Sequence, residues 1–154
     1  MKKRSTRLSL IERALIERDW HQTAIVAQIH ALCGNNSQGM VEAAGRVLFV
    51  VLAAVVADDH QLDSDDLNLI HQTLIAMHDQ VDDPEISSTR RACIICGLQA
   101  AERIIPLLQR CSLVSAACKL KEKLKKSHIL LEDFNDLIDF DQRRPINQDQ
   151  LQFF

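Results

Sequence analysis

The chain has 154 residues, 47% of them apolar, and a formal net charge of −3. This length suits a single domain that buries one sizeable hydrophobic core. With four glycines, three prolines and no tyrosine, the composition excludes the turn-rich, aromatic-rich pattern of an all-β protein, so an all-α fold is predicted.

Residues 1–8 form a basic N-terminal segment, MKKRSTRL. Arg7, Glu12 and Arg13 interrupt any apolar stretch that could act as the core of a signal peptide. We therefore expect a cytoplasmic protein with no membrane-spanning segment.

The first helix is predicted over residues 10–33. Ser9 and Glu12 have the spacing of a capping box, in which each side chain accepts a hydrogen bond from an amide at the helix start. A similar pattern recurs at Asp19, so this segment is either one long helix or two helices joined near Asp19. Gly34 supplies the C-terminal stop.

The stretch from residue 47 to residue 57, VLFVVLAAVVA, has no polar atom on any side chain. It is too short to cross a bilayer, and extending it toward the N-terminus brings in Glu42 and Arg46, so a buried core helix at about 38–57 is predicted. The predicted fold is a single-domain bundle of six or seven helices around this central helix, with the helical domain at residues 9–142.

Four more helices are predicted before a C-terminal tail at residues 143–154. Pro84 ends the first of them, because the residue before a proline is pushed out of helical geometry, and Pro106 should kink the second by removing an amide donor. The four helices run from Asp63 or Ser64 to about Val81, from Ser87 or Ser88 toward Cys111, from Ser112 to about Lys126, and from Ile129 to about Asp141.

An acidic turn follows the apolar run directly. Its carboxylates could together hold a hard cation, calcium or magnesium, because such ions prefer oxygen ligands. The alternative is a solvated acidic helix start, which opposes the positive end of the helix dipole. The spacing is not that of an EF-hand, since the turn glycine and the closing glutamate are missing. The candidate metal ligands are Asp59, Asp63, Asp65 and Asp66.

The same turn, DHQLDSDDL from Asp59 to Leu67, resembles the Asp-Gly-x-Val/Ile-x-x-x-Glu turn of the TerB-like family, which includes tellurite-resistance proteins and the N-terminal region of certain J-domain proteins. The resemblance implies an all-helical fold of similar size and a divalent-metal-binding stress-response role. His60 stands at the family's glycine position. An internal repeat is also implied, in which His60, Leu62, Asp65, Leu69 and Ile70 match His128, Leu130, Asp133, Leu137 and Ile138 at a constant offset. Ser127 replaces Asp59 in the second copy, which weakens a metal site built from both turns.

Five cysteines, an odd number, lie in helical apolar contexts, which favours reduced, buried thiols over a disulfide framework. Cys93 and Cys96 have the spacing of a redox dithiol, so a redox protein is one alternative. Burial inside an apolar helix is the preferred interpretation, because no strand precedes this pair. The other three cysteines are Cys33, Cys111 and Cys118.

Charge is segregated along the chain. No Lys or Arg lies between Arg46 and Arg90, while nine acidic residues lie between Asp58 and Glu85. From Arg90 to Lys126, nine basic residues oppose only two acidic ones. The two segments either complement each other within one chain or orient an association between chains. The basic run before Lys126 could follow phosphates, but we expect no nucleic-acid binding because the acidic segment offsets it.

No residue pattern indicates a catalytic group or a phosphate-binding loop. The sequence therefore predicts a non-enzymatic cytoplasmic interaction or regulatory protein that self-associates as a homodimer, with an unknown protein partner and no resident cofactor. The alternatives are a divalent-metal-binding TerB-like module, which would hold calcium or magnesium, and a nucleic-acid-associated regulator. The residues expected to supply the apolar part of an interface are Leu113, Leu120, Ile138, Phe153 and Phe154.

Overall fold

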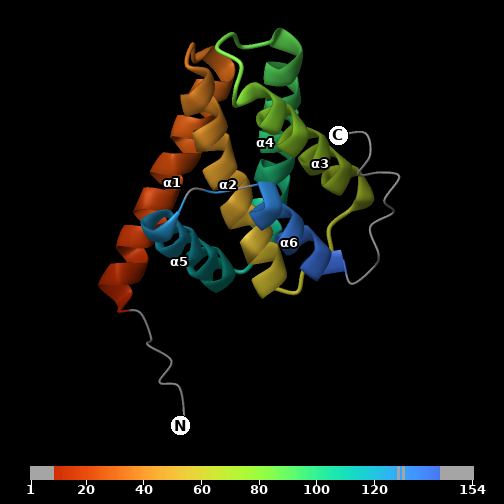
Figure 1. Cartoon of the computed structure of the whole chain (residues 1–154). Coiled ribbons are helices and arrows are strands. Elements are labelled where there is room, and N and C mark those ends of the chain that lie inside the picture. Colours follow the sequence, from red (N-terminus) through yellow and green to blue (C-terminus); the bar gives the residue numbers. More distant parts are fainter. Residues whose placement is uncertain (1–8, 128, 130, 143–154) are drawn as a thin grey trace.

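The computed structural model describes residues 9–127, 129 and 131–142, and all secondary structure within these ranges is helical (Figure 1). The prediction of a single all-α domain is confirmed. The elements are α1 (Leu10–Cys33), α2 (Ser37–Ala57), α3 (Ser64–Gln80), α4 (Ser88–Ile104), the short 3-10 helix η1 (Ile105–Leu107), α5 (Arg110–Lys126) and α6 (Leu131–Gln142).

Helix α2 is the buried centre of the bundle, as predicted. It packs against α1, α3, α4, α5 and α6, and Figure 1 shows it running through the middle of the molecule. Asn36 caps its start by accepting a hydrogen bond from the Gly39 amide at 3.1 Å. By length and hydropathy α2 could cross a membrane, but 78% of its most apolar window is buried inside the bundle, as in the core helix of a globular domain.

Helix α1 is one continuous helix, which decides between the two predicted possibilities. The capping box is formed, because the Ser9 amide donates to Glu12 Oε2 at 2.8 Å and the Glu12 amide donates to Ser9 Oγ at 3.1 Å. At the other end, the Arg91 guanidinium of α4 donates to the backbone oxygens of Ala31 and Gly34. A cation here satisfies carbonyls that the helix leaves without partners and complements its negative end.

Helices α3 and α4 approach closely at Gly97. The Thr73 hydroxyl of α3 lies 3.1 Å from the backbone oxygen of Cys93 and 2.7 Å from that of Leu69. A Cβ atom at position 97 would overlap the Thr73 side chain. Glycine is therefore required at this crossing, and the α3–α4 pair has the most extensive helix–helix packing in the described bundle.

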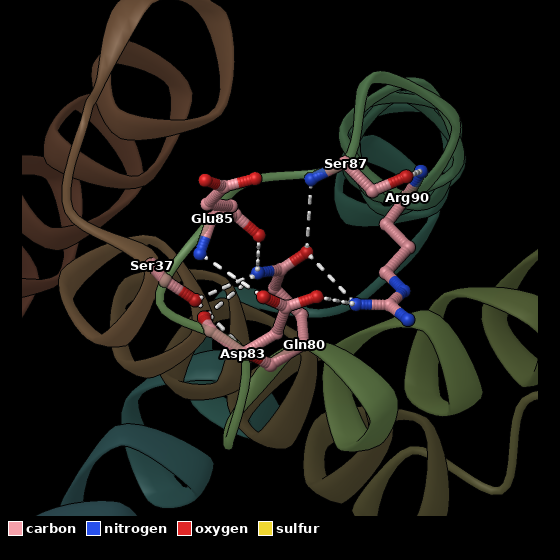
Figure 2. Close-up of polar contacts among 6 residues, drawn as sticks. All are labelled: Ser37, Gln80, Asp83, Glu85, Ser87 and Arg90. Atoms are coloured by element: carbon pink, nitrogen blue, oxygen red, sulfur yellow. Dashed lines mark hydrogen bonds and ion pairs between the residues drawn. The ribbon is translucent and has the colours of Figure 1, made fainter.

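One buried amide holds the connection between α3 and α4 (Figure 2). The Gln80 side chain is fully buried, and its Nε2 donates to Ser37 Oγ and to the backbone oxygen of Glu85, both at 2.8 Å. Its Oε1 accepts from the Ser87 amide at 3.3 Å. Because Ser37 begins α2 and Ser87 caps α4, one side chain ties three helices together at this end of the bundle.

The prediction of a kinked helix reaching Cys111 is wrong, because the chain leaves helical geometry earlier. Pro106 lies in η1, Leu108 is extended, and α5 begins at Arg110 rather than near Ser112. The Asp58 carboxylate, from the end of α2, accepts hydrogen bonds from the Gln109 amide at 3.3 Å and from Ser112 Oγ at 3.2 Å. An acceptor distant in sequence thus stabilises the start of α5.

Replacing Gly97 with alanine should lower the free energy of unfolding by about 2 kcal/mol or more, because α4 must move away from Thr73. Gly45→Ala is the matched control. Its Cβ would meet the flexible end of Met77 at 3.3 Å and the ring of Phe134 at 3.9 Å, an ordinary van der Waals distance. The roughly 1 kcal/mol gained in helix propensity offsets the closer contact. Urea unfolding of both variants measures the difference, and equal effects would contradict the close crossing.

Candidate functional site

The acidic junction begins with a left-handed turn at the end of α2. Asp59 has a φ of 50°, and it is the one residue with positive φ in the described part of the chain. Its amide donates to the backbone oxygen of Val56 at 3.2 Å, and the His60 amide donates to that of Val55 at 3.0 Å. These two bonds form a Schellman motif. The left-handed position is therefore Asp59, whereas the TerB-like resemblance places the turn glycine at residue 60.

The four predicted metal ligands lie on both sides of this turn and have different surroundings. Asp66 is partly buried and forms an ion pair with Arg103 at 2.8 Å. Asp63 occupies the N-cap position of α3 without a side-chain capping bond, and Asp65 lies in the first turn of that helix. Asp59, Asp63 and Asp65 are exposed.

These carboxylates do not converge on one point. Among the described residues, no group of three or more His, Cys, Asp or Glu side chains is placed to hold a metal ion. Asp65 and Asp66 instead oppose the positive end of the α3 dipole, and Asp58 stabilises the start of α5. The calcium or magnesium site stays a prediction that rests on residue types.

The second copy of the implied repeat lies between α5 and α6. His128 and Leu130 are outside the described residues. Asp133, which matches Asp65, lies in the first turn of α6 and forms an ion pair with Lys123 at 2.9 Å. In this second turn, too, an acidic residue has a structural partner within the chain.

The acidic and basic segments form ion pairs with each other within the chain, where α4 packs against α3 and the connection that follows it. Arg90 pairs with Asp83 at 2.9 Å, and Arg103 pairs with Asp66 at 2.8 Å. Both pairs join the acidic segment to the basic segment. They support complementarity within one chain, the first of the two interpretations of the charge pattern.

The expected burial of the cysteines is wrong, because three of the five are exposed and the other two are only partly buried. All five are free thiols, and Cys33, Cys96 and Cys111 are exposed. The inward face of α4 passes through Ile94, Gly97, Leu98 and Ala101, so position 96 faces outward.

Burial raises the pKa of the Cys93 thiol, with a smaller opposing effect from its hydrogen bond with Thr73. Redox-active thiols have lowered pKa values, so this shift is opposite to the one a redox dithiol needs.

Helix α1 has an apolar surface on both faces: one tryptophan and small alanines point inward, and large aliphatic side chains point outward. Its buried inner face contains Trp20, Ala27 and Ala31, with Ala24 packed beside them. Its outer face exposes large aliphatic side chains. Together with Arg18 and Gln22, which lie on the same face, they follow one another at steps of four and three residues. We call this set the outer stripe: Ile11, Leu15, Ile25, Ile29 and Leu32, each between 45% and 73% exposed.

The outer stripe was missed by sequence reasoning. The sequence contains two sets of apolar residues at helical spacing, one with Trp20 and the alanines and one that forms the outer stripe. Either set alone is enough to predict a helix, so the second set was not needed for that prediction. The residues proposed instead for an interface are placed differently. Leu120 is buried and Leu113 packs against the core, while the side chain of Ile138 and the whole of Phe153 and Phe154 lie outside the described residues.

No model of a known protein family matches the chain, and comparisons with curated proteins and with solved structures find no match either. The resemblance to the TerB-like turn therefore depends on the residues of the acidic junction alone.

Replacing Asp59 with glycine should raise the free energy of unfolding by about 0.5–1 kcal/mol, because glycine adopts a left-handed conformation without steric cost. His60→Gly is the control and should lower it by a similar amount, since glycine there only adds freedom to the unfolded chain. Thermal or urea unfolding compares the two variants. The opposite order would place the left-handed residue at position 60.

The metal prediction requires that calcium or magnesium stabilise the folded state. A cation that binds only the folded chain adds about 2.7 kcal/mol at a free concentration one hundred times its dissociation constant. The melting temperature should therefore rise with added calcium, and the rise should be lost in an Asp63→Asn, Asp65→Asn double variant, which keeps the Asp66–Arg103 pair. Unchanged melting curves and calorimetric heats at millimolar calcium and magnesium would remove the site.

Proposed function

We propose that this protein is a non-enzymatic, cytoplasmic interaction or regulatory protein that acts by self-association. The observation that carries the proposal is the outer stripe of α1. Figure 1 shows α1 along one edge of the bundle, and its outward face exposes large aliphatic side chains along its length.

The arrangement of large and small side chains on α1 supports this proposal. A helix that only covers a core places its large apolar residues inward and its polar residues outward. In α1 the buried positions include Ala27 and Ala31, while Ile25 and Ile29 are more than half exposed. Burying an aliphatic side chain of this size completely is worth about 1.5–3 kcal/mol. Because the side chains of the stripe are between 45% and 73% exposed, covering them would yield about half of this value for each, reduced by the cost of association.

The polar clusters of the structure support a non-enzymatic role. The Gln80 amide bonds to residues of the α2 start and of the α3–α4 connection, and the Asp58 carboxylate bonds to the start of α5. Both groups have structural partners, and each joins helices. These features fit a protein that binds a partner through the exposed surfaces of its helices better than they fit an enzyme.

Light scattering across a concentration series tests self-association directly. We expect a monomer at low micromolar concentration and a dimer toward millimolar concentration. Because the proposed contact is apolar and the Arg90–Asp83 and Arg103–Asp66 pairs are intramolecular, moderate salt should change the dissociation constant little. A strict monomer at every concentration would contradict the proposal, and strong weakening by salt would point to an electrostatic interface instead.

A further inference from the structure

We infer that the outer stripe is covered by the same stripe of a second copy of the chain, with the two α1 helices packed antiparallel. This inference rests on the proposed self-association and adds to it the interface, the occupant and the orientation. Three features of α1 lead to it: the spacing of the stripe, the position of its polar residues, and the distribution of charge along the helix.

The spacing of the stripe is that of a helix–helix seam. Positions 11, 15, 18, 22, 25, 29 and 32 alternate steps of four and three residues, which is the a/d pattern of a heptad repeat over three heptads. Five of these seven positions are Ile or Leu and are exposed. The buried positions of Trp20 and Ala27 lie on the opposite face of the helix. A second helix can therefore pack on the seam without displacing anything from the core.

The two polar positions select the orientation. A parallel pair would place Arg18 opposite Arg18 of the second copy, so two like charges would meet at the seam. An antiparallel pair centred on Gln22 places Arg18 between the levels of Ile25 and Val26, where its long side chain can cover apolar surface and extend to water. The same register joins Leu15 with Ile29 and brings Ile11 within one residue of the level of Leu32. The two Gln22 amides then meet near the symmetry axis, where each can donate to the other.

Charge along α1 favours the same orientation. All five charged residues of the helix, from Glu12 to Asp19, lie in its first half, and residues 22–33 contain no Asp, Glu, Lys or Arg. An antiparallel pair places the charged half of each copy against the uncharged half of the other. A parallel pair would align the two charged halves, in which three acidic and two basic residues leave the same net negative charge on each copy. The antiparallel pair also brings opposite ends of the two helix dipoles together.

The size of the seam sets the expected affinity. Helix α1 has 24 residues and is about 36 Å long. A seam one helix wide covers on the order of 400 Å² on each copy, about half the area that a standard interface buries per partner. A symmetric contact of this size predicts a weak, transient dimer that forms only well above low micromolar concentration.

The first experiment compares two exposed leucines. Leu32 lies in the stripe and is 66% exposed, while Leu107 lies in η1 and is 64% exposed. Leu32→Lys should raise the dissociation constant by about tenfold or more, and Leu107→Lys should change it less than about twofold. A lysine near the C-terminal end of α1 interacts favourably with the negative end of the helix dipole, so the helix should be preserved. Circular dichroism and the melting temperature of the variant check this. Equal effects of the two variants would place the interface elsewhere.

The second experiment measures orientation by crosslinking of the full chain in which the exposed Cys33, Cys96 and Cys111 are serine. With a short bis-maleimide, a mixture of the Leu15→Cys and Ile29→Cys chains should form crosslinked dimers. Each chain alone should not, because two copies of residue 15 would lie about 21 Å apart along an antiparallel seam. Gln22→Cys is the positive control, since this residue meets its own copy in either orientation.

Each crosslinking outcome has a separate meaning. Crosslinking of Leu15→Cys alone would show a parallel pair and overturn the antiparallel inference. No crosslinking of any chain, Gln22→Cys included, while light scattering still shows a dimer would overturn the seam and leave the proposed self-association standing. A chain that remains monomeric in light scattering would overturn both.

Discussion

Burial of the apolar surface of α2 is the constraint on which the rest of the structure depends. The segment from Val47 to Val55 has side chains that are apolar in every direction around the helix, and every one of them is buried. A helix of this kind cannot lie at the surface of a bundle, because one half of it would remain in water. It must be surrounded, and within the described residues each of the five other α helices packs against it.

Surrounding one helix with five requires close approach, and small residues make this possible. Ala27 and Ala31 form much of the α1 face that packs inward, and Gly97 lets α3 and α4 cross in contact. The ends of the helices are then fixed by groups from other elements. Arg91 caps α1, and Asp58 stabilises the start of α5. These long-range contacts hold the short connections in place.

The parts of this fold that could be predicted are those set by local chemistry. The capping box at Ser9 and the apolar run of α2 are properties of neighbouring residues, and they identified a helix start and the core helix. The break at Pro106 was misjudged as a kink, because the acceptor that stabilises the new helix start, Asp58, lies about fifty residues away in sequence. Similarly, the acidic turn was recognised from its residue types, but only the backbone shows that Asp59 is its left-handed residue.

The same distinction explains why the outer stripe was not anticipated. Periodicity shows which residues share a face of a helix, but not which of two apolar faces the core will cover. In α1, the packing against α2 decides which face is buried. Close packing against a crowded central helix favours the face with the alanines over the face that carries Ile25 and Ile29. The large aliphatic side chains are then left outside. The close packing around α2 thus leaves α1 with exposed aliphatic side chains, and the proposed self-association would cover this surface in the way that the bundle covers α2.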